Sequence, residues 1–395
     1  MNDSPDPSQS AHKGILPVLA AYLEASSKQL QSCISECVHP FSLTEPKATV
    51  HLQYVKFDPA NGEPKFDVLA KVLAKHVVRF SLSLSTREQI KKSIEDPDEG
   101  DLFLRARDYF RKIEDAGEVG ELLLFFLMEA AFGAPQVVCK MELKTNSGDE
   151  VKGADGIHVK WDSNDDHLDV FLGESKLYGD ISSALTSIFK SITEFYDLGR
   201  LDEELHLVTA HFKHIDKNLQ DIITSFINRA SPDSSCHVIH ACLVGFDWSD
   251  YKLLLGDKRQ EFFIQFEDHY RRYAPSIEKM LNSRFKSCTH KHVSFKFLFL
   301  PFKDVMEFRH AFYRALLGVD VPTLNRSRAT KVEEPPTPQD VRKPAGAEKP
   351  PGRPSLEAPA PLHEPTKPVP DTKPEERMIP TAPKNSEKTD DSSQP

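Results

Sequence analysis

The sequence predicts an α/β protein in which helices flank a mixed β-sheet. Between residues 116 and 320, apolar runs of strand length are interspersed with longer runs that have helical periodicity. Three of the strand-like runs follow one another with only turns between them, and the later ones alternate with helices. This order favours one layered core that contains both antiparallel and parallel neighbours.

The first element of this core is a helix over residues 118–132. Strong helix formers fill the segment, and Gly133 and Pro135 stop it. Apolar residues cover every side of the predicted helix, so we expect it to be buried.

Three strands then form a predicted meander over residues 137–143, 155–161 and 168–177. Turn-forming residues at 146–148 and 162–166 separate them. Asp180 is placed to cap the next helix, whose apolar residues recur at helical spacing as far as Tyr196.

The remaining core elements are expected in alternation. We predict strands at residues 205–212, 236–246 and 292–300, and helices near residues 253–284 and at residues 305–317.

Outside this core we distinguish three segments. Residues 1–13 are expected to be disordered. Residues 14–115 contain a strand-like run at 48–57 and a helix at 66–80, and form an N-terminal α/β region. This region is either a small separate domain, which could bind a partner, or an elaboration packed on the core.

Residues 325–395 are predicted to be a disordered, proline-rich tail. They hold 16 of the 29 prolines and no Phe, Trp or Tyr, so little apolar area is available to offset the entropy of ordering. The segment contains 12 basic and 12 acidic residues, which means that the net charge of −10 falls on residues 1–324. An acidic balance argues against tight, unaided binding of duplex DNA.

The cysteines and the apolar runs indicate a cytoplasmic protein. The 6 cysteines are scattered without a CxxC pair or a secreted disulfide pattern. No N-terminal targeting signal is recognisable, and the longest strongly apolar run, residues 122–128, is too short to span a bilayer.

Two acids and one lysine stand out as candidate catalytic residues. Asp155 is expected to end one strand, and Glu174 and Lys176 lie two apart on the next strand, so their side chains share a sheet face. Two carboxylates can hold Mg²⁺ against a phosphodiester, and an ammonium group can orient the attacking water. An Asp followed by Glu-x-Lys also occurs by chance in chains of this length. The interpretation therefore depends on the predicted strand, on the buried helix before it and on the amphipathic helix after it.

The order of elements with Ala154-Asp155 and Glu174-Ser175-Lys176 resembles the core of the PD-(D/E)xK nuclease superfamily, although the usual Pro before Asp is absent. The segments Gly-Glu-Val-Gly-Glu at 117–121, Gly-Ala-Asp-Gly-Ile-His at 153–158 and Gly-Glu-Ser-Lys-Leu-Tyr at 173–178 resemble the HamA family, the nuclease subunits of bacterial Hachiman anti-phage systems. The likeness covers roughly residues 110–320.

The resemblance implies a restriction-endonuclease-like fold and a site for Mg²⁺, with Mn²⁺ as a substitute. Asp155 and Glu174 would be metal ligands together with the backbone carbonyl of Ser175, and Lys176 would position the water. The first helix often supplies a further acid. Glu118 and Glu121 are equally placed by periodicity, and we choose Glu121 because it lies nearer the buried run.

The resemblance also implies DNA as substrate and a separate helicase subunit, similar to HamB, that restrains the nuclease until suitable DNA is exposed. A standalone restriction or repair nuclease is the alternative enzyme. A non-catalytic nuclease-fold scaffold that docks DNA or protein is the alternative of another class. The sequence leaves the oligomeric state open.

Two groups that contain histidines are not expected to bind zinc. The first group is Cys236, His237, His240 and Cys242, and the second is His206, His211 and His214. The first group lies within an apolar strand, where thiols usually pack as small hydrophobic groups. Neither group has the spacing of a zinc finger. His158 could touch a phosphate, although a strand histidine is more often structural. No glycine-rich loop followed by Lys and Ser or Thr is present, so any use of ATP is expected of a partner.

Overall fold

The computed structural model describes residues 17–45, 47–93, 98–110, 117–143, 153–164, 167–210, 220–221, 223–224, 236–255, 259–290 and 293–318. The predicted disordered segments 1–13 and 325–395 and the predicted turn at 146–148 lie outside these residues. None of the described helices is both long enough and apolar enough to cross a bilayer.

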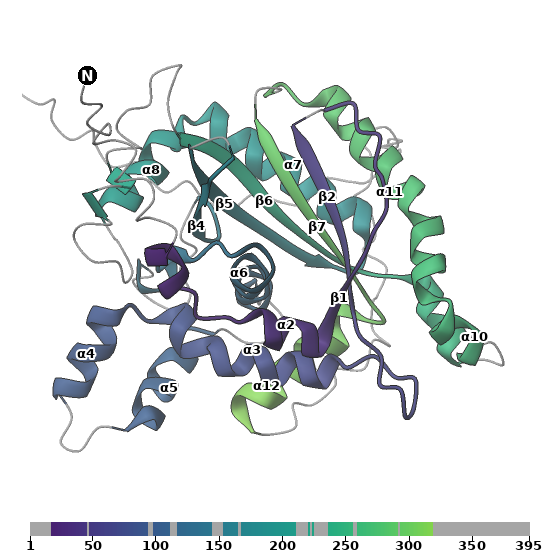
Figure 1. The fold of residues 1–395 in the computed structure, drawn as a ribbon, viewed down its shortest axis with the longest axis horizontal. Helices are drawn as coiled ribbons and strands as arrows, with labels where there is room; N and C mark the ends of the chain where they lie inside the picture. The colour runs from purple at the N-terminus through teal and green to yellow at the C-terminus, as the bar shows by residue number, and fades with distance from the viewer. Residues whose placement is uncertain are drawn as a thin grey trace, which may run out of the picture. The chain divides into compact units, whose positions relative to one another are not determined.

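Seven strands in the described part of the chain form one mixed sheet, in the order β1-β2-β7-β6-β5-β4-β3 (Figure 1). From β2 through β7 and β6 to β5 the neighbours pair in parallel, whereas β1 with β2, β5 with β4 and β4 with β3 pair antiparallel. The predicted α/β class with a mixed sheet is therefore confirmed. The strands are β1 (Ile34–Cys37), β2 (Ala48–Val55), β3 (Gln136–Val138), β4 (Ile157–Asp162), β5 (His167–Tyr178), β6 (Cys236–Asp247) and β7 (Ser294–Phe302).

Helices cover both faces of the sheet. On one face, α7 (Ile181–Asp197) packs on β5 and β6, and α11 (Phe266–Ser287) lies against α7. On the other face, α6 (Glu118–Phe132) packs on β5, with α3 (Phe66–Ser81) and α12 (Val305–Leu317) beyond it (Figure 1). The remaining helices are α2 (Ser27–Cys33), α4 (Leu84–Ser93), α5 (Glu99–Arg107), α8 (Arg200–Ala210), α10 (Arg259–Ile264) and the 3₁₀ segments η2 (Lys140–Leu143) and η3 (Ser249–Leu255).

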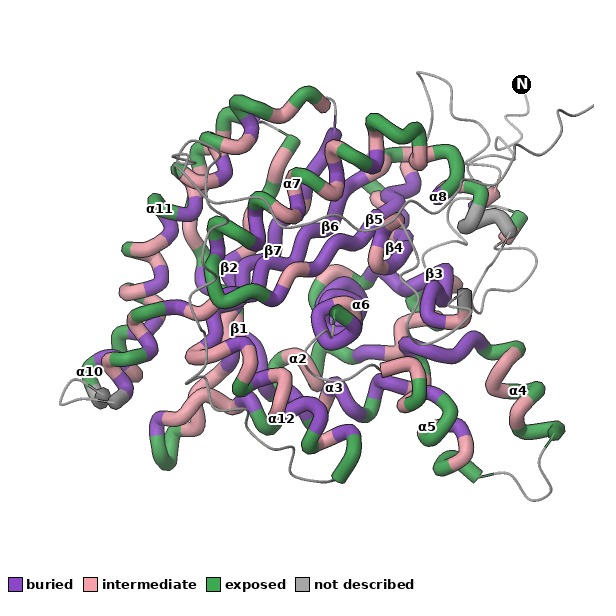
Figure 2. Tube along the Cα trace, turned by 180° about the vertical axis from the view of Figure 1, so that it is seen from behind, coloured by how far each residue is buried: buried purple, intermediate pink, exposed green. Residues whose placement is uncertain are grey.

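The central helix α6 shows why an apolar sequence on all sides forms a buried helix. The sheet covers one side of it, and α3 and α2 cover other sides, so it is buried along most of its length (Figure 2). Gly133 ends it in the left-handed conformation at φ +64°, which glycine adopts without a steric penalty. The predicted helix bounds are those observed.

The N-terminal region contributes to the same sheet. β2 pairs in parallel with β7, from Ala48 opposite Phe295 to Leu52 opposite Phe299, and α3 packs against α12. Of the two arrangements that the sequence left open, the described residues show the elaboration packed on the core.

Three sequence predictions are wrong in detail. Residues 205–210 belong to helix α8 and not to a strand, because Leu201 and Leu205, one helical turn apart, pack together on the apolar cluster beside α7. The strand predicted over 137–143 ends at Val138 and continues as η2. The helix expected near 253–284 is divided into η3, α10 and α11.

Candidate functional site

Glu174 and Lys176 lie on the same face of β5, under α7. The Lys176 ammonium is 2.7 Å from Glu174 Oε1, and the side chains are 21% and 10% exposed. The Ser191 hydroxyl of α7 also hydrogen-bonds the Glu174 carboxylate. The prediction that the period of a strand brings this acid and this base together is confirmed.

Asp155 reaches the pair from the chain segment that precedes β4. It was expected at the end of a strand, but it lies in a bend two residues before β4 begins. Its backbone amide donates to the Gly173 carbonyl at 2.7 Å, and its Oδ2 accepts hydrogen bonds from the Ser175 amide at 2.6 Å and the Ser175 hydroxyl at 2.7 Å. These bonds fix the Asp155 carboxylate beside the middle of β5.

The electrostatics of the site follow from burial and from the proximity of the two acids. Burial first, and then the Asp155 carboxylate, raise the pKa of Glu174 to about 7. Burial alone would lower the pKa of Lys176, but the neighbouring Glu174 and Asp155 carboxylates raise it. The pocket therefore favours a bound positive charge.

Ser175 faces the opposite side of β5, toward the first turn of α6. A methyl group on Gly120 would lie 3.0 Å from Ser175 Oγ and 3.3 Å from Leu177 Cγ, so a glycine permits this close approach of helix and strand. The first turn of α6 therefore lies against the Ser175 hydroxyl that holds Asp155, on the face of β5 opposite Glu174 and Lys176.

The two glutamates of this first turn have different surroundings. Burial lowers the pKa of Arg309, and the buried Glu118 is among the groups that act in the opposite direction. The Arg309 guanidinium donates to the Leu177 carbonyl of β5 at 3.0 Å. Glu121 is half-buried, and its Oε1 lies 3.5 Å from where a side chain on Gly117 would begin.

Sequence reasoning missed a buried ion pair that holds the segment leading to Asp155. Lys140 Nζ lies 2.7 Å from Glu204 Oε1, and the side chains are only 5% and 3% exposed. The same carboxylate oxygen accepts a hydrogen bond from the Ala154 amide at 3.2 Å. A Cβ on Gly153 would lie 1.7 Å from that oxygen, which explains the glycine at φ +111°. The two charged residues are 64 apart in the chain, so no local pattern could reveal the pair.

Among the described residues, none of the histidines singled out in the sequence forms a metal-ligand group with Asp155. His158 is buried, and its Nδ1 lies 2.9 Å from the Ala134 carbonyl oxygen, a structural contact. In β6, alternation places His237 on the face opposite Cys236, His240 and Cys242, so the four do not form one ligand set. His206 is exposed on α8, and His211 and His214 lie outside the described residues.

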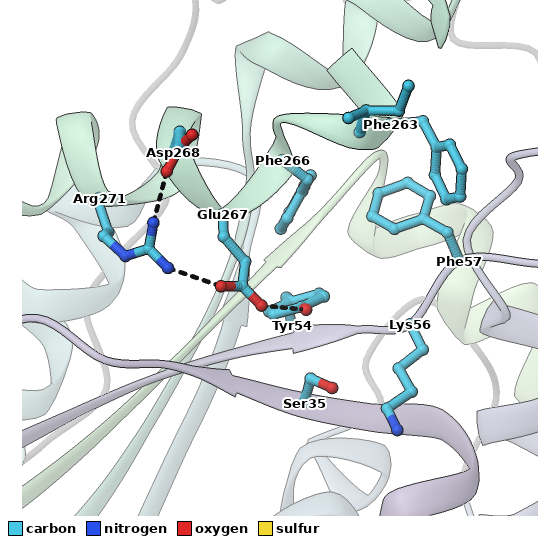
Figure 3. A pocket seen from close by; sticks show the side chains of 10 residues that line it. Ser35, Tyr54, Lys56, Phe57, Phe263, Phe266, Glu267, Asp268 and Arg271 are labelled. Atoms are coloured by element: carbon cyan, nitrogen blue, oxygen red, sulfur yellow. Dashed lines mark hydrogen bonds and ion pairs between the residues drawn. The ribbon is translucent and has the colours of Figure 1, made fainter. Parts of the chain in front are cut away.

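A hollow of about 450 Å³ lies at the other end of the sheet, between the β1–β2 edge and α10–α11 (Figure 3). In it Arg271 pairs with both Glu267 and Asp268, and the Tyr54 hydroxyl donates to Glu267 at 2.7 Å. These charges already have partners inside the hollow, which makes it a poorer candidate for phosphodiester chemistry. Its lining is Ser35, Tyr54, Lys56, Phe57, Phe263, Ile264, Phe266, Glu267, Asp268 and Arg271.

Comparison with known protein families identifies a match over most of the chain. The model of the family described as HamA matches residues 31–316, from α2 to α12, and thus includes the whole sheet and the candidate site. A comparison with curated proteins found no significant match.

Proposed function

The chain belongs to the HamA family, which is associated with Hachiman defence, and from this premise we propose that it is a metal-dependent DNA endonuclease controlled by a partner helicase. One observation carries the proposal, namely the convergence of Asp155, Glu174 and Lys176 at the middle of β5. This set contains the acids and the base that hydrolysis of a phosphodiester requires.

The donors fit a hard divalent cation. Asp155 and Glu174 offer carboxylate oxygens, and the mutual repulsion that raises the pKa of Glu174 would be relieved by a cation. Mg²⁺ is the expected ion, with Mn²⁺ as a substitute. When bound, it would stabilise negative charge on the phosphate and acidify a bound water.

The remaining roles belong to side chains and backbone around the pair. Lys176 would hold the attacking water, because its ammonium lies beside Glu174 and stays protonated at neutral pH. Ser175 orients Asp155 through two hydrogen bonds, and its carbonyl is the proposed third oxygen donor. Glu121 is the proposed additional acid, since the first turn of α6 lies against β5.

The net charge supports dependence on a partner. Residues 1–324 carry the whole surplus of acidic residues, so the chain lacks the basic balance of a protein that grips duplex DNA by itself. A helicase subunit that delivers DNA to the site would supply the missing affinity.

The test is plasmid cleavage by the full chain with Mg²⁺, Mn²⁺ or EDTA, with and without the helicase encoded beside it and ATP. The variants are Glu174→Ala and Lys176→Ala. The matched control is the exposed pair on α7, as Lys190→Ala and Glu194→Ala, whose charges are 3.7 Å apart and 73% and 58% exposed. Glu174, with a pKa of about 7, can take up a proton when Lys176 is removed, so no buried charge need remain. We therefore expect the first two variants to fold and to lose cleavage, and the controls to retain it.

The outcomes separate the candidate functions. Metal-dependent cutting only in the presence of the helicase supports the restrained effector. Equal cutting without the helicase indicates a standalone nuclease. Cleavage that survives Glu174→Ala contradicts the site, and absence of cleavage under every condition indicates a non-catalytic scaffold.

A further inference from the structure

Three potential metal ligands converge on the α6 side of the sheet, at the beginning of β5 and β6. Asp169 Oδ1 lies 2.9 Å from His167 Nε2 and 3.1 Å from His237 Nδ1. The Asp169 side chain is 12% exposed, while His167 and His237 are 20% and 45% exposed. A buried carboxylate needs a hydrogen-bond donor or a cation as partner, and here two imidazoles present ring nitrogens to the same Asp169 oxygen.

We propose that His167, Asp169 and His237 bind a divalent transition-metal ion of the Zn²⁺ class. The three ligand atoms all lie within 4.8 Å of one another. Zn–N and Zn–O bonds are about 2.0–2.2 Å, so ligands of one ion are at most about 4.4 Å apart, and only a small adjustment would complete the set.

The surroundings of His237 support this site independently of the three distances. Its other ring nitrogen, Nε2, lies 2.7 Å from the Ser294 hydroxyl of β7. Metal-binding histidines usually donate their second N–H to such a partner, which fixes the ring and the tautomer. In the proposed site Nδ1 of His237 binds the ion beside the Asp169 carboxylate, and the proton on Nε2 is donated to the Ser294 hydroxyl.

The chemistry of the donors selects the class of metal. Two imidazole nitrogens and one carboxylate suit Zn²⁺, Co²⁺ or Ni²⁺ better than Mg²⁺, which prefers oxygen ligands. The exposure of His237 leaves a way in from solvent and open positions for water.

Two lysines oppose a cation and so limit its affinity. Lys160 is opposite Asp169 in the β4–β5 register. Burial lowers the pKa of Lys296 on β7, Lys160 lowers it further, and Asp169 acts in the opposite direction. Neutralising Lys160 should therefore tighten metal binding. A cluster joined only by histidine–carboxylate hydrogen bonds does not predict this effect.

This cluster is separate from the candidate nuclease site. Asp169 and Glu174 are five residues apart on β5, which corresponds to about 16 Å along the strand. They also face opposite sides of the sheet, Asp169 toward the α6 side and Glu174 toward α7. The two sites can therefore be tested independently.

The test is calorimetric titration of the full chain with Zn²⁺, together with the visible absorption of bound Co²⁺, in a Glu174→Ala background so that the nuclease site does not contribute. We expect one equivalent to bind. His167→Ala and His237→Ala should weaken binding by more than about tenfold. Loss of a residue that only hydrogen-bonds a ligand already costs about tenfold in metal affinity, and these two residues are the ligands themselves. Asp169→Asn, which retains the shape of the side chain, should also weaken it, and Lys160→Met should strengthen it.

The matched control is His290→Ala, because His290 and Asp197 form a histidine–carboxylate pair at 3.0 Å without a second described imidazole ligand. Its variant should bind Zn²⁺ as the parent does. Thermal melts without metal verify that each variant folds. The proposal is overturned if no equivalent binds, if binding persists in His167→Ala and His237→Ala, or if His290→Ala weakens binding equally.

Discussion

The buried Lys140–Glu204 pair gives the sharpest test of what holds the Asp155 segment in place. Lys140→Met removes the ammonium that lies 2.7 Å from Glu204 Oε1, while the carboxylate stays 3% exposed. An uncompensated buried charge of this kind costs about 3–5 kcal/mol. The remaining hydrogen bond from the Ala154 amide offsets only part of that.

The assay is equilibrium unfolding in urea at pH 7, with Lys140→Met, the double variant Lys140→Met/Glu204→Gln, and an exposed control pair. We expect the single variant to lose about 3–5 kcal/mol of unfolding free energy and the double variant to regain most of it. The regain is expected because a neutral glutamine still accepts from Ala154 and leaves no buried charge. The control Lys91→Met breaks the 2.8 Å Lys91–Glu99 pair, which is 47% and 80% exposed, and should change stability by less than about 1 kcal/mol.

The reasoning would be refuted by either of two results. In one, Lys140→Met costs no more than Lys91→Met, which would mean that water reaches the Glu204 carboxylate. In the other, the double variant is no more stable than Lys140→Met, so that charge burial is not the source of the loss.

Three further predictions concern pH and two glycines. Burial lowers the pKa of His240 from 6.5 to about 3, so below pH 6.5 the unfolded chain binds a proton that the folded chain excludes, and stability falls with acidification. At pH 5 the loss of unfolding free energy from this proton is about 2 kcal/mol. Urea unfolding at pH 7 and pH 5 measures the loss, which should be smaller in His240→Gln than in the parent. An equal loss in both proteins would exclude His240 as its source. Gly153→Ala should destabilise the protein more than Gly199→Ala, because both have positive φ but only Gly153 lacks room for a Cβ; equal melting temperatures would contradict the clash with Glu204. Gly120→Ala should cost about 1–3 kcal/mol through overpacking against Ser175 despite the better helix propensity of alanine, and a stabilised variant would show that α6 can shift.

Part of the site could be predicted from the sequence because its geometry is local. Glu174 and Lys176 are two residues apart on one strand, and alternation alone places them on one face. The position of Asp155 beside β5 follows from the hairpin between β4 and β5, in which Ile157 is opposite Leu172. The Ser191 contact to Glu174 comes from a separate helix, so neither spacing nor composition indicated it.

The sequence by itself determined the α/β class, the helices α6 and α12 to the residue, and the strands β5, β6 and β7 to within a few residues. Tertiary structure alone decided that β2 lies beside β7, that residues 205–210 are helical, and that Lys140 meets Glu204 and His167 meets His237. The physical reason is the separation along the chain of the residues that interact. Periodicity and capping act between residues that are a few positions apart, whereas strand order and buried charge pairs depend on free energies between segments distant in the chain.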